Sequence, residues 1–124
     1  MTLPPDPVAQ SQRLSLRLLT EDDAAFMLRL VNEPGWLANI GDRGVRTLED
    51  AAKYLREGPL TLYARLGFGF WAIELHDHPQ PIGICGLIRR DTLPDVDIGY
   101  ALLGEFEGHG YATEAAQLTV KLAR

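Results

Sequence analysis

The sequence predicts an α+β domain in which a mainly antiparallel sheet is flanked by helices. The chain has 124 residues, a length typical of one domain. Hydrophobic residues make up 46% of it and charged residues 23%, as in ordinary soluble globular proteins. The predicted elements run in the order strand, helix, helix, three strands joined by short turns, and helix. Strands grouped in this way favour antiparallel pairing.

The first half of the chain begins with a strand and a capped helix. Leucines alternate with polar residues over 14–18, which predicts a strand with one buried face. A threonine followed by three acidic residues at 20–23 predicts a helix start, and the Asn-Glu-Pro-Gly run at 32–35 predicts its end. Residues 36–46 show no clean period and contain two glycines, so we expect a loop there.

A second helix, three strands and a last helix follow. Thr47 is a helix cap, apolar residues then recur at helical spacing up to Leu55, and Gly58-Pro59 ends the helix. Residues 60–66 fit a loop, a short helix or a short strand. Strands separated by turns at 76–80 and 91–95 are expected at Phe70–Leu75, Pro81–Ile88 and Val96–Leu103. A helix is expected from about Ala112 to the end, with a face of small residues that packs closely on a sheet.

Charge and composition exclude several classes of protein. The net charge of −5 argues against a nucleic-acid or anionic-membrane partner bound by bulk electrostatics. No stretch approaches the roughly 20 continuous apolar residues of a membrane span. Residues 1–12 are proline-rich and lack an apolar signal core, so we expect a flexible arm before a domain at 13–124. By elimination the expected compartment is the cytoplasm.

The cysteine and histidine content predicts no metal site and no disulfide. Cys85 is the sole cysteine, and its apolar surroundings favour a buried packing role. His76 and His78 lie in a turn with no third ligand close by, so a solvated hairpin is a better interpretation than zinc.

The turn from Glu107 to Ala112 is the part of the sequence that points to chemistry. It contains Gly108 and Gly110 just before the last predicted helix. A helix N-terminus exposes unpaired N–H groups and a partial positive charge, and glycine lets the backbone approach a phosphate closely. Together they make an anion cradle that needs no lysine. On two glycines alone, a turn that merely begins a helix is the favoured interpretation.

The surrounding residues reverse that preference. The run Gly110-Tyr111-Ala112-Thr113-Glu114-Ala115, after three antiparallel strands, resembles the Gcn5-related N-acetyltransferase (GNAT) superfamily. It looks most like the branch of ribosomal-protein N-terminal acetyltransferases, and the likeness spans roughly 14–124. That family's cofactor signature is Gln or Arg, two residues, Gly, one residue, then Gly or Ala. Gly110 and Ala112 fill the last two places. Three further stretches also resemble this branch: Gly69–Ile73, Pro81–Gly83 and Asp97–Tyr100.

The resemblance implies a GNAT-like acyl-CoA N-acyltransferase fold and direct transfer of an acetyl group from acetyl-CoA to an amine. The cofactor is implied to contact the last predicted strand at Tyr100, Ala101 and Leu102, and the turn at Gly108, His109, Gly110, Tyr111, Ala112 and Thr113. The amine must lose a proton before it attacks. Asp97 is the first candidate for that base and Asp95 the second, with a solvated residue as the alternative for each. Trp36, Asp42 and Arg43 occupy the region that usually contacts the acceptor.

Two features favour a binding or assembly module without activity. Glu107 stands where Gln or Arg is usual, and a carboxylate pointing at a pyrophosphate is unfavourable. Family domains also normally continue with further strands and a helix, so we expect an incomplete domain whose C-terminal strands are absent.

The sequence does not identify the acceptor, which is either a protein N-terminus or a small-molecule amine. An exposed edge at Val96–Leu103 predicts pairing of two chains.

Overall fold

In the part of the chain that the structure describes, five strands form one antiparallel sheet at the centre. The computed structural model describes residues 7–39, 41–61, 70–76, 78, 80–89 and 96–122, with the backbone alone at 39, 87–89, 96–99 and 122. The strands lie in the order β1-β2-β3-β4-β5, each antiparallel to its neighbour. Their bounds are β1 (Pro7–Gln10), β2 (Leu14–Leu18), β3 (Phe70–Leu75), β4 (Pro81–Arg89) and β5 (Val96–Leu102).

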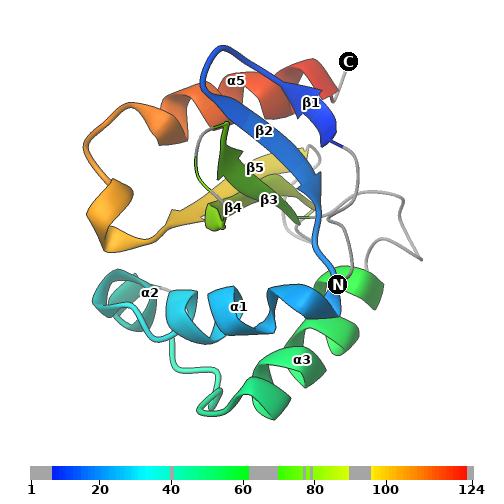
Figure 1. Cartoon of the computed structure of the whole chain (residues 1–124), viewed down its shortest axis with the longest axis vertical. Coiled ribbons are helices and arrows are strands. Elements are labelled where there is room, and N and C mark those ends of the chain that lie inside the picture. Colours follow the sequence, from blue (N-terminus) through cyan, green and yellow to red (C-terminus); the bar gives the residue numbers. More distant parts are fainter. Residues whose placement is uncertain are drawn as a thin grey trace.

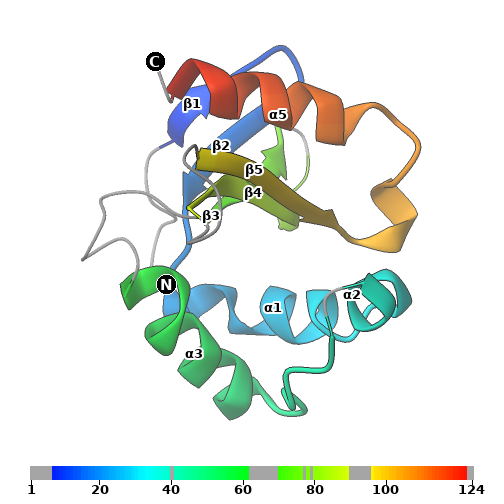
Figure 2. The same cartoon turned by 180° about the vertical axis from the view of Figure 1, so that it is seen from behind.

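Helices cover both faces of this sheet. Figures 1 and 2 show α1 and α3 on one face and α5 across the other. The predicted α+β fold with a mainly antiparallel sheet is therefore confirmed. The helix bounds are η1 (Glu21–Asp23), α1 (Ala24–Leu30), α2 (Pro34–Asn39), α3 (Leu48–Glu57), η2 (Gly104–Phe106) and α5 (Tyr111–Leu122), where η denotes a 3₁₀ helix.

Two hydrophobic cores result from the alternation of side chains along the strands. In β3, Trp71 and Ile73 pack in the core beneath α5, whereas Ala72 packs in the core beneath α1 and α3. β4 changes this alternation at an irregularity opposite Ile73 and Glu74, where the pairing shifts by one residue. The extra residue breaks the alternation, so Ile82 packs in the core beneath α5, whereas Ile84, two residues further on, packs in the core beneath α1 and α3. The sheet thus holds α5 and the α1–α3 pair on opposite sides.

A buried ion pair fastens the start of the first helical segment to the sheet. Arg17 on β2 donates through both terminal nitrogens to Asp23, at 2.9 and 2.7 Å, and Nε lies 3.1 Å from Glu74 on β3. The side chains of Arg17 and Asp23 are only 5% and 7% exposed. Burial lowers the pKa of Arg17, but the hydrogen bonds and charges of Asp23 and Glu74 more than offset this, so its pKa is raised. Thr20 completes a capping box with Asp23.

Two of the predicted segments differ in the structure. The flexible arm expected over 1–12 is wrong for Pro7–Gln10, which form β1 and pair with β2. These residues are mostly exposed, so β1 carries no alternating apolar pattern that would reveal a strand. The loop expected over 36–46 is wrong for its first part, because α2 runs from Pro34 to Asn39. Proline is compatible with the first turn of a helix, and a helix of six residues is too short to show a clear period.

The other predicted elements agree with the structure to within one or two residues. Thr47 caps α3 by accepting from the amide of Asp50, and α3 ends before Gly58. The predicted turn at 91–95, most of the open segment at 60–66 and residues 1–6 lie outside the described residues. No helix in the described ranges is long and apolar enough to cross a membrane.

Candidate functional site

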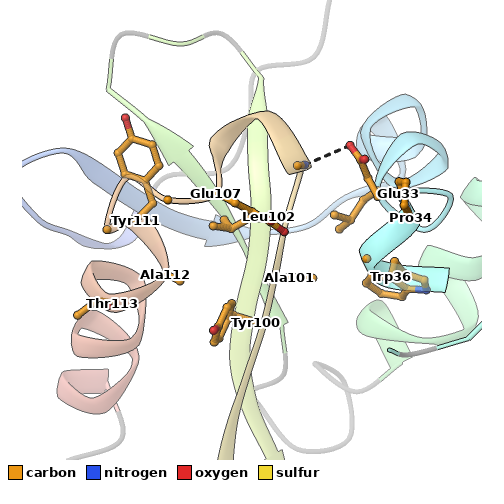
Figure 3. Close-up of a pocket in the computed structure, with 15 residues that line it drawn as sticks. Glu33, Pro34, Trp36, Tyr100, Ala101, Leu102, Glu107, Tyr111, Ala112 and Thr113 are labelled. Carbon is orange, nitrogen blue, oxygen red and sulfur yellow. Dashed lines mark hydrogen bonds between the residues drawn. The ribbon is translucent and has the colours of Figure 1, made fainter. Parts of the chain in front are cut away.

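A cleft of about 800 Å³ lies where the end of β5, the start of α5 and the α1–α2 corner meet. Figure 3 shows β5 between α5 on one side and α2 on the other. Five of its lining residues come from the α1–α2 corner and the others from β5, the turn after it and the first turn of α5. They are Leu30, Glu33, Pro34, Gly35, Trp36, Tyr100, Ala101, Leu102, Gly104, Glu107, Gly108, Gly110, Tyr111, Ala112 and Thr113.

The end of β5 presents main-chain hydrogen-bonding groups at the edge of the sheet. The amide of Leu103 donates to the carbonyl of Ile82, next to β4, at 2.8 Å. Because successive residues of an antiparallel strand point their N–H and C=O groups alternately toward and away from the neighbour, those of Tyr100 and Leu102 point away from β4. β5 ends the strand order of the described sheet. An extended ligand with amide groups can therefore pair with this edge.

The turn before α5 has the backbone conformation that glycine allows. Gly108 and Gly110 have φ angles of +81° and +80°, a region that other residues rarely adopt. The amide of Glu114 donates to the carbonyl of Gly110 at 3.1 Å, so Gly110 caps the helix. Within the part of the chain that the structure describes, the amides of Tyr111, Ala112 and Thr113 have no protein acceptor. These three residues line the cleft, so unpaired donors and the positive end of α5 meet there.

The charged side chains among the described lining residues are two carboxylates. Glu33 lines the cleft from the α1–α2 corner and accepts from the amide of Gly104 at 3.4 Å, a contact drawn in Figure 3. Arg29 lies 3.9 Å from Glu33 and also forms an ion pair with Glu105. Glu107 lines the cleft from the opposite wall, and its side chain is exposed. Among the described lining residues, the donors open to an anion on the turn are therefore main-chain amides and hydroxyl groups, with an acidic residue nearby.

A link to the start of the sheet supports the turn from outside the cleft. Arg13, in the β1–β2 turn, donates from Nη1 to the carbonyl of His109 at 3.0 Å and from Nε to Glu114 at 2.7 Å. Its guanidinium carbon lies 4.7 Å from the centre of the Tyr111 ring. Glu114 also accepts from the main-chain amide of Arg13 at 3.0 Å and from the hydroxyl of Ser11. The turn is thus joined to β1 and β2 on both sides of Gly110.

Most residues predicted to bind a cofactor lie together at this cleft. Tyr100, Ala101 and Leu102 come from β5, and five of the six predicted turn residues join them; the exception is His109, which does not line the cleft. Trp36, predicted near the acceptor, lines the opposite wall. A contact between each of these residues and a cofactor or acceptor stays a prediction.

Other candidate residues lie elsewhere. Asp42 does not line the cleft; it pairs with Arg46, which lowers its pKa by hydrogen bonding. Asp97 lies on β5 opposite Ile88, with its side chain outside the described part, and Asp95 lies outside it altogether. Cys85 is fully buried in the core beneath α5, which confirms its packing role. Burial raises the pKa of its thiol to about 11, and its sulfur lies 3.3 Å from the Thr119 hydroxyl.

The histidines of the predicted hairpin contact main-chain carbonyls. His76 Nε2 lies 3.0 Å from the carbonyl of Leu14, and His78 Nδ1 lies 2.8 Å from that of Gln80. Among the described residues, no group of three or more His, Cys, Asp or Glu side chains is placed to hold a metal ion.

Sequence comparison identifies the family. Residues 13–124 match the acetyltransferase (GNAT) domain, and the chain therefore belongs to the GNAT acetyltransferase family. The acetyl donor of this family is acetyl-CoA.

Three solved structures illustrate the likeness of fold. An acetyltransferase from Agrobacterium tumefaciens is 24% identical over 99% of this chain and 70% of its own, with a TM-score of 0.73. The ribosomal L7/L12 α-N-protein acetyltransferase RimL, in complex with coenzyme A, is 20% identical over 94% and 67%, with a TM-score of 0.75. The ribosomal-protein-S5-alanine acetyltransferase from Vibrio fischeri is 19% identical over 94% and 66%, with a TM-score of 0.71. The chain thus spans about two thirds of the length of these proteins.

Proposed function

We propose that this chain transfers the acetyl group of acetyl-CoA to an amine, either a protein N-terminus or a small-molecule amine, by direct attack on the thioester. One observation carries the proposal. A single cleft joins the outward main-chain groups of Tyr100 and Leu102 to the unpaired amides of Tyr111–Thr113. A coenzyme A molecule has amide groups along its pantetheine arm and a pyrophosphate beyond them, so it offers complementary groups to both.

The residues of the cleft fit such a cofactor. The amides of Tyr111, Ala112 and Thr113 would hold the pyrophosphate at the positive end of α5, where anions are stabilised without a lysine. Tyr100 and Leu102 would hold the pantetheine amides by extending the sheet at its edge. When bound, acetyl-CoA supplies a thioester whose carbonyl carbon an amine can attack.

The base for the reaction is proposed on β5. The attacking amine must be neutral, and Asp97, three positions before Tyr100 on the same strand, would take its proton. The other wall of the cleft, with Trp36 and Glu33, would face the acceptor. A protonated amine would be attracted to Glu33 before it loses its proton.

A second function is favoured by one observation. Glu107 lines the cleft, and a carboxylate there opposes the binding of a pyrophosphate. A module that binds coenzyme A weakly, or assembles with another protein without catalysing transfer, would tolerate this residue.

Two measurements separate these functions. Thermal-shift titration with acetyl-CoA tests binding, and release of free thiol from acetyl-CoA in the presence of a panel of amines tests transfer. Amine-dependent thiol release supports the enzyme, whereas binding without release supports the module. Absence of any stabilisation at millimolar acetyl-CoA would refute both the enzyme and the coenzyme A-binding module, because a ligand that binds only the folded state must raise the melting temperature; assembly with another protein would then be the function left.

A further inference from the structure

The β1–β2 turn and the turn before α5 are joined by charged contacts that the proposed reaction does not itself use. We propose that Arg13 and Glu114 are positioning residues for the cofactor cradle, holding the amides of Tyr111–Thr113 in place from outside the cleft. This inference rests on the proposed function, because it assigns the two residues to its phosphate site. Neither residue lines the cleft, so neither is proposed to touch the reacting atoms.

The turn needs such support because little else holds it. Residues 107–110 are all exposed. Among the described residues, its recorded main-chain hydrogen bonds are two, from Glu107 to Gly104 and from Glu114 to Gly110. Two of its four residues are glycines at positive φ, which have many alternative conformations open to them. The hydrogen bond from Arg13 to the carbonyl of His109 fixes the peptide group that joins His109 to Gly110, just before α5.

The contacts of Arg13 are directional. Its Nε and Nη1 reach two different residues, Glu114 and the carbonyl of His109, while the plane of the guanidinium lies near the Tyr111 ring. A Cβ placed on Gly110 would lie 3.4 Å from Arg13 Nη2, an ordinary contact distance, so the guanidinium lies directly beside Gly110. A rigid fork of donors can fix a loop in this way, whereas an ammonium group cannot make the same set of bonds.

Glu114 holds the other side of the link. Its carboxylate is 16% exposed and receives the Ser11 hydroxyl, the Arg13 amide and the Arg13 Nε. Burial raises the pKa of Glu114, but these hydrogen bonds more than offset it, so the pKa is lowered. A negative charge in the first turn of α5 would repel a phosphate if it were unpaired. Arg13 compensates this charge while Glu114 orients Arg13.

The direction in which one substitution changes the affinity for coenzyme A separates a positioning role from a simple charge effect. Glu114→Gln removes a negative charge close to the proposed phosphate site, so charge alone predicts tighter binding of coenzyme A. Positioning predicts weaker binding, because the glutamine side chain has one acceptor oxygen where glutamate has two. It also carries no charge, so the ion pair with Arg13 is lost. We expect Glu114→Gln and Arg13→Ala each to weaken coenzyme A binding by about tenfold, the effect of losing one charge-assisted hydrogen bond.

The experiment is isothermal titration of the intact chain with coenzyme A and with dephospho-coenzyme A, which keeps the pyrophosphate but lacks the 3′-phosphate. The matched control is Arg56→Ala. Arg56 forms an exposed ion pair with Glu21, at 2.6 Å, and neither residue lines the cleft. Arg13→Lys, which keeps the charge but not the fork, serves if Arg13→Ala does not fold; it should bind more weakly than the parent.

Equal losses for both ligands in the Arg13 and Glu114 variants, with the control unchanged, support the inference. Unchanged affinity in the folded Arg13 variants would overturn it, as would tighter binding by Glu114→Gln. A loss confined to coenzyme A would also overturn it, because Arg13 would then contact the 3′-phosphate directly. If the parent chain binds neither ligand, the proposed function fails instead, so the two failures are distinguishable.

Discussion

Replacing either glycine of the turn by alanine tests whether its left-handed backbone is what holds the cofactor. Gly108 and Gly110 have φ angles of +81° and +80°, where an L-residue costs roughly 1–2 kcal/mol. A Cβ on Gly108 meets nothing within 4 Å, and one on Gly110 meets Arg13 Nη2 at 3.4 Å, an ordinary contact. The cost in both variants is therefore mainly backbone strain, about 1–2 kcal/mol, rather than a clash.

This strain can appear in stability or in binding. If the turn keeps its conformation, the free energy of unfolding falls; if it relaxes, binding must restore the conformation and the affinity falls. Because the turn is exposed and has few main-chain bonds, we expect it to relax and coenzyme A to bind about tenfold more weakly. Titration calorimetry measures the affinity and thermal unfolding the stability.

Gly44→Ala is the matched control. Gly44 has a φ of +73°, its Cβ would meet nothing within 4 Å, and it does not line the cleft. We expect this variant to lose stability without any change in affinity. If Gly108→Ala and Gly110→Ala match the parent in both stability and affinity, the left-handed turn is not needed and the reasoning is refuted.

Four further results are expected. Glu107→Gln should tighten coenzyme A binding in low salt, with a smaller gain in high salt because exposed charges are screened; equal affinities in low salt would show that the carboxylate points away. Asp97→Asn should lower turnover mainly at neutral pH, where the amine arrives protonated, and an unaltered acidic limb of the pH–rate profile would place the base elsewhere. Asp23→Ala should cost about 3 kcal/mol in denaturant unfolding, the low end for breaking a buried ion pair because Glu74 still pairs with Arg17, and a loss under about 1 kcal/mol would contradict this. In the absence of coenzyme A, the β5 edge at Val96–Leu102 should pair two chains, and light scattering that shows a monomer at all concentrations would exclude that pairing.

The strands and longer helices were predictable because each leaves a local pattern. Phe70–Leu75 was predicted with its observed bounds, and the cap at Thr47 marked the start of α3. β1 and α2 were missed for the opposite reason. β1 is exposed and is a strand because β2 offers it an edge, and α2 is a two-turn helix with no room for a period.

The candidate site likewise contains residues that the sequence predicted and residues that it did not. The turn around Gly110 was predicted because the run from Gly110 to Ala115, which carries the family resemblance, is contiguous in the sequence, whereas the two glycines alone did not favour a cofactor site. Eight of the nine predicted cofactor residues line the described cleft. Arg13 and Glu33 were missed. Arg13 reaches its partners from about a hundred residues away in the sequence, and Glu33 reaches Gly104 from a different layer of the fold. No pattern near either residue marks it out.

By itself, the sequence determined the class of fold, the order of its elements, and the glycine turn that begins the last helix. These follow from backbone preferences and from the period of apolar residues, which neighbouring residues set. Only the tertiary structure decided that the α1–α2 corner closes the cleft, that Tyr100 and Leu102 turn their main-chain groups to its open edge, and that Arg13 and Glu114 meet outside the cleft beside the turn before α5. Those features depend on which distant segments pack together. A contact between residues about a hundred positions apart forms only when the intervening chain has folded into the sheet and brought them close.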